Sequence, residues 1–388
     1  MNKQINVLEG FKKNECVGCS NCMNICPSKA ISMRYEKDGF LYPVIELDKC
    51  ISCGMCKKVC QITEKKESCT DRKIESYIAI TKDKQVYMNA ASGGIFGTLA
   101  KHFLTRFLDS SVVGATYIDR KVQHIFVNSA NDIHILQNSK YVQSDLNRVF
   151  VSIRERLDNN QYVLFSGTPC QVYALKLFLR KDYEKLFTID LICHGVPSPL
   201  FLEKDLEAYG SNIKEFSFRN KKYFFKSRSM FILSVSRSKN RFDGRKVMYN
   251  RDPFYSLFTS NLSFRESCYD CKFANINRVG DITIGDCDSY KFYPDFHMKE
   301  ATSTVLVNSD KGKKLWEEMN GYFEYRELDL NKEVEVNTQL QKPSRFPENY
   351  QDIIEDINTK DIRYLQKKYA RPNDIREKIA LIKELILP

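Results

Sequence analysis

The sequence predicts a small α+β module at the N-terminus, followed by a larger α/β domain with a partly parallel, mixed sheet. Three observations lead to this prediction. Eight of the 14 cysteines lie in the first 60 residues and repeat one spacing twice. A polar linker, residues 63–73, then separates this module, residues 7–62, from the rest of the chain. Beyond the linker, short apolar runs alternate with segments of helical periodicity, which is typical of parallel strands joined by helices.

Both cysteine runs have the spacing of iron–sulfur ligands. Each run places three cysteines at every third position and a fourth one four residues later. In paired runs of this kind the fourth thiolate binds the cluster of the other run. Zinc sites favour two separated cysteine pairs, so the doubled run favours a bacterial ferredoxin-like module with two 4Fe-4S clusters. The expected ligands are Cys16, Cys19, Cys22 and Cys60 for the first cluster, and Cys50, Cys53, Cys56 and Cys26 for the second.

The overall charge favours an anionic partner. The chain has 60 Lys+Arg against 49 Asp+Glu, a formal net charge of +11. This charge favours an acidic electron-donor protein such as ferredoxin, or an anionic substrate. No nucleic-acid motif accompanies it, so we expect no nucleic-acid partner. The densest basic segment, residues 219–228, is either a solvated hairpin or a docking patch for an acidic donor or a phosphorylated substrate.

Neither a membrane span nor a signal peptide is expected. No run of 18 apolar residues occurs, and the polar start at residues 1–6 lacks the apolar core of a signal peptide. The free thiols of iron–sulfur ligands need a reducing compartment, so we expect a cytoplasmic protein.

Apolar runs and helical periodicity define the α/β domain, whose two parts we place at residues 74–158 and 159–330. Ser92 is expected to cap a helix with Gly93 and Gly94 in its first turn. A charged, partly helical tail, residues 331–388, follows, and its role is open. The expected strands are residues 74–81, 111–117, 124–127, 162–165, 186–192, 229–236, 281–285 and 303–308, and the expected helices are residues 92–107, 145–158, 170–180 and 373–386.

Four further cysteines are expected to meet at one edge of the sheet. Cys170 and Cys193 each follow a strand, and parallel strands place their carboxyl ends at the same edge, where α/β proteins bind ligands. A Cys268-x-x-Cys271 pair would complete a third cluster. The spacing leaves three alternatives open: buried core cysteines, a zinc site, or nucleophilic chemistry by Cys170 or Cys193 with His194 as base. The two cysteines without a role are Cys69 and Cys287.

Several short motifs outside the cysteine runs occur together in one family. These motifs are Ala91–Gly94, Lys140–Ser144, Ser166–Gln171, Asp190–Ser198, Cys268–Ala274 and Arg278–Asp286. On them the chain, from about residue 12 to about residue 320, resembles the beta-subunit family of coenzyme F420 hydrogenases and dehydrogenases. The family includes subunits that reduce a deazaflavin coenzyme and stand-alone ferredoxin-dependent reductases. After Asp286 the chain departs from the aromatic residues that are common in the family, which leaves the substrate open.

The resemblance implies a third 4Fe-4S cluster and a flavin, usually FAD. The implied ligands of the cluster are Cys170, Cys193, Cys268 and Cys271. The implied flavin residues are Ser92, Gly93 and Gly94, at a helix start suited to phosphate, together with Lys140, Tyr141, Gln143 and Ser144. The implied catalytic residues, for proton transfer and charge stabilisation, are His194 and Arg278. Without the resemblance, residues 92–94 are interpreted as the start of an ordinary capped helix, and residues 140–144 as a polar loop.

We therefore predict a ferredoxin-dependent iron–sulfur flavoprotein oxidoreductase. Clusters pass single electrons, whereas a flavin collects two and delivers a hydride equivalent to an organic or glycan-precursor substrate. An alternative is a non-catalytic electron-transfer subunit of a larger redox complex. A third hypothesis is a glycan-precursor-binding protein with structural or sensory clusters. A homo-oligomer is one possible assembly, and the sequence leaves the oligomeric state open.

Overall fold

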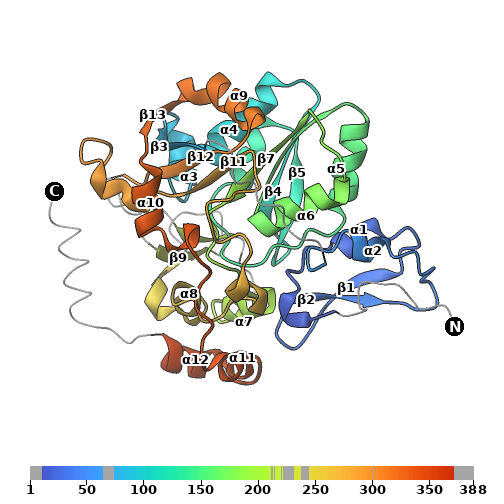
Figure 1. The fold of residues 1–388 in the computed structure, drawn as a ribbon. Helices are drawn as coiled ribbons and strands as arrows, with labels where there is room; N and C mark the ends of the chain where they lie inside the picture. Colours follow the sequence, from blue (N-terminus) through green and yellow to red (C-terminus); the bar gives the residue numbers. More distant parts are fainter. Residues whose placement is uncertain are drawn as a thin grey trace.

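A small N-terminal module lies beside a larger α/β body in the computed structural model (Figure 1). The described residues are 11–63, 74–210, 213, 215–219, 221, 231–236, 244–298 and 300–370. None of the helices within these ranges has the length and apolar character that a membrane crossing requires. The predicted fold class, an α+β module followed by an α/β domain with a partly parallel mixed sheet, is confirmed.

The module repeats one unit twice, as the doubled cysteine spacing predicted. Each unit has a short helix that carries the third cysteine of its run, α1 (Asn21–Ile25) with Cys22 and α2 (Met55–Lys58) with Cys56. Each helix follows a residue in the left-handed conformation, Ser20 at φ 58° and Gly54 at φ 69°. Between the two units, β1 (Ile31–Tyr35) and β2 (Leu41–Ile45) form an antiparallel hairpin.

The α/β body is built on an eight-stranded sheet with the order β13-β3-β12-β11-β7-β6-β4-β5. Its centre, from β4 through β6 and β7 to β11, is parallel, and the pairs outside this centre are antiparallel. The parallel strands therefore end at one edge, as predicted. The strands are β3 (Glu75–Thr81), β4 (Ser110–Ile118), β5 (Lys121–Val127), β6 (Tyr162–Gly167), β7 (Leu186–Leu191), β11 (Ile282–Asp286), β12 (Ser303–Val307) and β13 (Phe323–Glu327).

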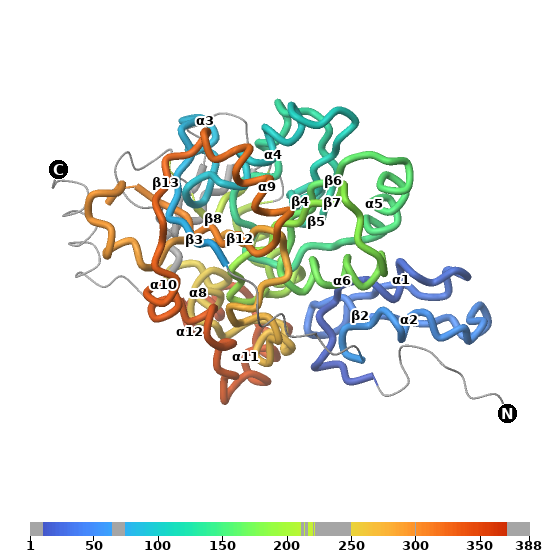
Figure 2. The backbone as a smooth tube through the Cα atoms, turned by 45° about the horizontal axis from the view of Figure 1, so that its top comes forward, coloured from blue at the N-terminus to red at the C-terminus, as the bar shows by residue number. Residues whose placement is uncertain are grey.

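Helices cover both faces of this sheet (Figure 2). Alternate residues of β6 show the two faces: Val163 and Phe165 pack in one core with α5 (Val149–Asp158) and α6 (Pro169–Leu179). Leu164 packs in the other core, with α4 (Ile95–Arg106) and α9 (Asp310–Met319). The first core continues into the module through Cys22 and Met23, so the module and the sheet share buried apolar surface, which stabilises their association.

A third group of elements packs below the sheet, in the view of Figure 1, around the cluster of Phe218, Phe254 and Phe264. A three-stranded antiparallel sheet with the order β10-β9-β8 belongs to this part. Its elements are α7 (Pro199–Glu207), β8 (Glu215–Arg219), β9 (Phe231–Ser236), β10 (Gly244–Met248), α8 (Pro253–Thr259), α11 (Tyr350–Thr359) and α12 (Ile362–Tyr369).

Two predictions about local structure need comment. The helix expected to start at a Ser92 cap is α4, whose N-cap is Gly94 at φ 84°. Ser92 Oγ instead donates to the Thr302 carbonyl at 2.7 Å, so the Ser92 cap was wrong. Part of the predicted tail is packed structure, because Ile353 and Leu365 of α11 and α12 lie in the core with α8. The helix predicted at residues 373–386 lies outside the described residues.

Candidate redox site

The first predicted set of module cysteines comes together in the structure. Burial, together with the neighbouring Cys60 and Cys16 thiols, raises the pKa of the Cys19 thiol to about 12. The pKa of Cys22 is raised by burial and then by Cys19, Cys16 and Cys60. The four thiols therefore lie within electrostatic range of one another, as the crossed assignment of the fourth cysteine requires. The Gly18 amide donates to Cys16 Sγ at 3.4 Å, a contact typical of cluster sulfur ligands.

The second predicted set lies farther out on the module. Cys53 is exposed, Cys26 and Cys50 are half-buried, and Cys56, on α2, is buried. Ile51, beside this loop, is 65% exposed. A cluster on this set would therefore be the one nearest to the surface and to an external electron carrier.

The third predicted set, Cys170, Cys193, Cys268 and Cys271, also comes together. Burial raises the pKa of Cys170 to about 12, and Thr168 Oγ1 lies 3.1 Å from its sulfur. The pKa of Cys268 is raised well above its usual value by burial and then by the Cys193, Cys271 and Cys170 thiols. All four residues are half-buried and line a cavity, so the alternative of Cys170 and Cys193 as buried core cysteines does not fit.

The first and third thiol sets supply the number of ligands that a 4Fe-4S cluster needs. Such a cluster is a cube with four thiolates spread around it. The first set has the Gly18 amide beside Cys16 Sγ, and the third has Thr168 Oγ1 beside Cys170 Sγ. Both sets can therefore hold a cluster.

His194 does not form the dyad that the nucleophile alternative requires. Among the described residues its ring is hydrogen bonded through Nδ1 to Gln339 Nε2, at 2.9 Å. Burial lowers its pKa from the usual value. His194 does line the same cavity as the third cysteine set, so a role in proton transfer stays a prediction.

The first and third cysteine sets are joined by direct hydrogen bonds. Gln61, which follows Cys60, donates from Nε2 to the Cys170 carbonyl at 3.1 Å. Lys272, which follows Cys271, donates to the Gln61 carbonyl at 3.2 Å. These contacts place the first module set next to the third set, with the second module set on the outside.

The cavity beside the third set has a volume of about 1080 Å³, at the upper end of the usual range for ligand pockets. The Gly93 amide does not line it; it donates to Ser303 Oγ at 2.9 Å. Arg278 is also absent from its walls. The predicted residues that do line it are Ser92, Gly94, Lys140, Tyr141, Gln143, Ser144, Cys170, Cys193, His194, Cys268 and Cys271.

Lys140 and Tyr141, two of the predicted flavin residues, line the cavity. The Lys140 side-chain nitrogen donates to the Leu136 and Gln137 carbonyls at 3.0 and 2.6 Å, and burial lowers its pKa to about 7. The ring of Tyr141 stacks on Phe258 with centroids 4.4 Å apart. Lys140 thus loses its proton more readily than an ordinary lysine, and Tyr141 forms part of an aromatic wall.

Gln143 and Ser144, which were also predicted to hold the flavin, form hydrogen bonds within the protein. Gln143 donates from Nε2 to the Val17 carbonyl at 2.9 Å, so it also joins the α/β body to the module. Ser144 Oγ accepts from Gln171 Nε2 at 3.0 Å. Gln143 and Ser144 therefore shape the wall where the module, α6 and the cavity meet.

Sequence reasoning misplaced the described part of the basic segment 219–228. Arg219 and Lys221 are each 5% exposed, so neither is solvated nor part of a surface patch. Arg219 Nη1 lies 2.5 Å from Asp286 Oδ2, and the Lys221 ammonium donates to the Tyr87 and Ser92 carbonyls. Asn220 and residues 222–228 lie outside the described residues.

Two acidic residues of the cavity were missed. Asp286 and Asp288 line it at the carboxyl end of β11. Burial, with the Glu333 carboxylate second, raises the pKa of Asp288 to about 7. Their position just after a parallel strand was the signal available in the sequence, because ligands bind at that edge.

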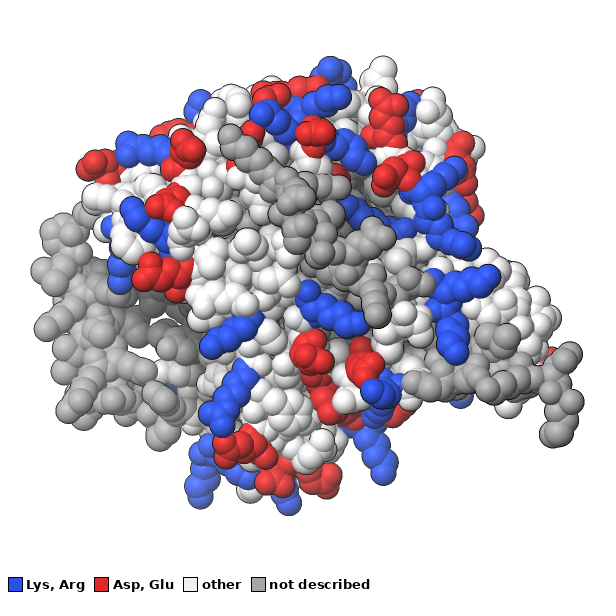
Figure 3. Space-filling model, viewed as in Figure 1, with Lys and Arg blue, Asp and Glu red and all other residues white. Residues whose placement is uncertain are grey.

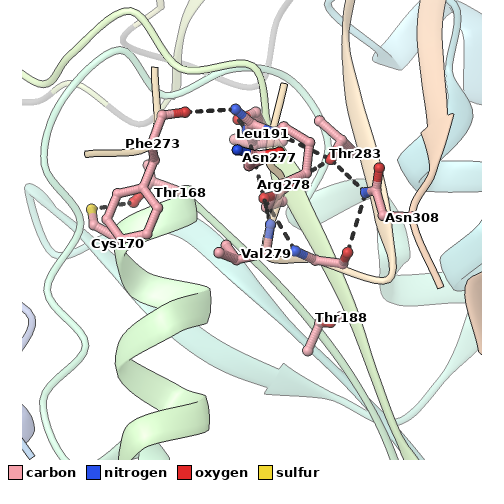
Figure 4. Close-up of polar contacts among 12 residues, drawn as sticks. Thr168, Cys170, Thr188, Leu191, Phe273, Asn277, Arg278, Val279, Thr283 and Asn308 are labelled. Atoms are coloured by element: carbon pink, nitrogen blue, oxygen red, sulfur yellow. Dashed lines mark hydrogen bonds and ion pairs between the residues drawn. The ribbon is translucent and has the colours of Figure 1, made fainter. Parts of the chain in front are cut away.

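Arg278 lies in a buried polar network between β7 and β11 (Figure 4). Its Nη2 donates to the Leu191 carbonyl at 2.6 Å and its Nη1 to the Phe273 carbonyl at 2.8 Å. It also lies 3.5 Å from the Asp190 carboxylate. These contacts are structural, so the described geometry gives Arg278 no direct access to a substrate in the cavity.

Fold and site define an iron–sulfur protein in which a two-cluster module is attached to an α/β domain with a further thiol-lined cavity. Residues 15–63 match the 4Fe-4S dicluster domain. Residues 160–331 match the family described as the C terminus of the coenzyme F420 hydrogenase/dehydrogenase beta subunit. The predicted resemblance is thus confirmed over residues 160–331 for the family domain and over residues 15–63 for the ferredoxin-type domain.

Two curated relatives match a short stretch of this chain. An uncharacterized ferredoxin of Methanocaldococcus jannaschii is 45% identical over 49 residues, 12% of this chain and 29% of the relative. An uncharacterized polyferredoxin-like protein of the same organism is 37% identical over 57 residues, 12% of this chain and 33% of the relative. The chain thus spans about a third or less of these relatives' length, and the matches support an iron–sulfur, electron-transfer module.

One solved structure is similar over more of the chain. It belongs to the xenon-derivatised F420-reducing [NiFe] hydrogenase complex from Methanosarcina barkeri. The similarity covers 74% of this chain and 92% of the other, at 19% sequence identity and a TM-score of 0.49. A likeness at this level does not establish a shared activity.

Proposed function

We propose that this protein is a ferredoxin-dependent iron–sulfur flavoprotein oxidoreductase. One observation supports this proposal most directly. The cavity of about 1080 Å³ is lined both by the third cysteine set and by residues predicted to hold a flavin, Ser92, Gly94, Lys140 and Tyr141. An electron carrier and an organic cofactor that line the same cavity can exchange electrons over a short distance.

The order of the cysteine sets supports a direction of transfer from the surface inward. The set with the exposed Cys53 lies outermost. The set with Cys60 follows, and the Gln61–Cys170 hydrogen bond connects it to the third set at the cavity. Clusters supply single-electron transfer, and a flavin, when bound, collects two electrons for a hydride transfer. The protein holds these sites in sequence, and Cys22 of the middle set is buried whereas Cys53 of the outer set is exposed.

The outer part of the module is the proposed docking surface for an acidic one-electron carrier. Leu47 and Ile51 are 57% and 65% exposed there, and Asp48, Lys49 and Lys58 are also exposed. Figure 3 shows acidic and basic side chains interspersed over the α/β body, and large neutral areas on the visible part of the module. Exposed apolar side chains accompanied by lysines suit a small acidic partner.

Anaerobic reconstitution tests the proposal. The purified chain would be supplied with iron, sulfide and FAD, and all three would be quantified after gel filtration. We expect about 12 iron atoms, because three clusters hold four each, and one flavin. Reduced ferredoxin should then bleach the flavin absorbance. A chain that binds clusters but retains no flavin contradicts the flavoprotein proposal.

A second candidate is an electron-transfer subunit without a substrate of its own. The matched family domain is described as part of a beta subunit, which favours this candidate. Purification under mild anaerobic conditions separates the two. A stoichiometric partner, together with no flavin reduction by the isolated chain, would favour the subunit, whereas reduction by the chain alone favours the stand-alone reductase.

A further inference from the structure

Arg278 joins two chain segments that carry ligands of the third cysteine set. Its Nη2 bonds to the carbonyl of Leu191, two residues before Cys193. Its Nη1 bonds to the carbonyl of Phe273, two residues after Cys271. The Arg278 side chain is only 1% exposed. One guanidinium therefore fixes the spacing between the strand end of β7 and the loop that follows the Cys268–Cys271 pair (Figure 4).

The charge partner of Arg278 is equally buried. The Asp190 side chain is 0% exposed, and its Oδ2 lies 3.5 Å from Arg278 Nη2. The Val279 and Gly280 amides each donate to the same oxygen at 3.2 Å, and Thr283 Oγ1 donates to Oδ1. Water does not screen charges in such a place, so both of them act strongly on their surroundings.

Both charges lie beside the chain segments that carry the ligands, with opposite signs. Arg278 Nη2 donates to the carbonyl of Leu191, and Asp190, the residue before Leu191, is three residues before Cys193. The cation and the anion therefore act in opposite directions on the charge of a cluster held by these segments.

We propose that Arg278 is a positioning residue that also sets the reduction potential of the third cluster. The inference rests on the proposed function, because it requires a cluster on Cys170, Cys193, Cys268 and Cys271. Uptake of one electron from the module makes this site one unit more negative, with no bond or proton transferred. The Arg278 cation stabilises the added charge, and the Asp190 anion limits that stabilisation.

Two substitutions with opposite expected signs test this proposal. The full chain would carry Arg278→Gln or Asp190→Asn, and the potential of each cluster would be measured by anaerobic redox titration with electron paramagnetic resonance. We expect R278Q to lower the electron affinity of the third cluster at least tenfold, about 59 mV for a one-electron couple. We expect D190N to shift the potential in the opposite direction. Arg278→Lys should keep the charge and a potential near that of the wild type.

Iron and sulfide content, measured on the same samples, distinguishes failure of the proposed function from failure of the inference about Arg278. The control is Lys314→Gln, which removes an exposed charge on α9 and should leave all potentials unchanged. A wild-type chain with only the two module clusters contradicts the proposed function and this inference with it. R278Q with full iron and an unchanged potential overturns the inference alone, as do shifts of R278Q and D190N in the same direction. If R278Q loses the third cluster, D190N decides by the sign of its shift.

Discussion

Arg265 Nε donates a hydrogen bond to the main-chain oxygen of Cys16 at 2.5 Å, across 249 positions of the sequence. The same side chain bonds to the Leu41 carbonyl at 3.0 Å and to Gln143 Oε1 at 2.9 Å. Its guanidinium also lies over the Tyr42 ring, 4.2 Å from the centroid. One fully buried arginine of the α/β body thus holds the first ligand loop of the module in place.

Replacement of Arg265 by alanine is expected to loosen the module. It removes hydrogen bonds from a charged group, each of which contributes about 1.5–3 kcal/mol. Hydrogen exchange of the amides in residues 16–45 should therefore become faster, while exchange in the eight-stranded sheet changes little. Arg34→Ala, which removes an exposed arginine of the same module, is the matched control. Equal protection of the module in R265A and R34A would contradict the role given to Arg265.

Features that depend on closely spaced residues were predictable from the sequence. The cysteine runs predict the ligand sets of the module, because cysteines three residues apart indicate a cluster whatever the rest of the fold. The central strands were found because parallel strands, buried on both faces, form continuous apolar runs such as Val163–Phe165. The meeting of Cys170 with Cys193 followed from the edge rule for parallel strands.

The contacts between distant segments were not predictable. Nothing near Arg265 in the sequence indicates that it reaches Cys16, and nothing near Lys221 indicates that it is buried. The wrong Ser92 cap has a local cause: Gly94, which adopts φ 84°, takes the N-cap position, and Ser92 bonds to Thr302 instead. Single-sequence patterns record local preferences, and tertiary contacts override them.

Loss of one ligand of the third set should remove one cluster and leave two. Cys170→Ala is expected to reduce the iron content from about 12 to about 8 atoms per chain, because each cluster holds four. Cys287→Ala is the matched control, since Cys287 is also buried but bonds to Ser289 and Glu333. The measurement is iron and sulfide analysis after anaerobic reconstitution. A loss of iron in C287A equal to that in C170A would contradict the assignment.

Gly94→Ala should weaken both the start of α4 and flavin retention. Gly94 has φ 84°, and an added Cβ would lie 2.6 Å from Thr81 Cγ2. The left-handed conformation alone costs a non-glycine residue about 1–2 kcal/mol, so the apparent midpoint of thermal unfolding should fall. Gly321→Ala is the control, because a Cβ there meets nothing within 4 Å. Flavin retained equally by G94A and G321A would exclude the α4 start from the flavin site.

Lys140 predicts a definite pH dependence of stability. Burial lowers its pKa from the ordinary 10.5 to about 7, so between these pH values the unfolded chain binds a proton that the folded chain does not. The contribution of Lys140 to the free energy of unfolding therefore rises as the pH increases from 7 to 10.5. Below pH 7 both states are protonated, and Lys140 destabilises the folded state by its full amount. His124, on which the Lys140 charge acts, stays neutral across this range because burial lowers its pKa to about 4.

Lys140→Met removes the contribution of Lys140 to the pH dependence of stability. A comparison of this variant with the wild type therefore separates Lys140 from the other titrating groups. The measurement is the apparent midpoint of thermal unfolding of K140M and of the wild type at several pH values. K140M should gain most over the wild type near pH 6, and this difference in midpoint should decrease steadily toward pH 10. The exposed Lys84→Met on α3 (Lys84–Asn89) should show no such slope. All samples need one scan rate, because cluster loss makes unfolding irreversible. A K140M difference that is constant with pH, or that grows with pH, would show that Lys140 is charged in the folded protein at neutral pH.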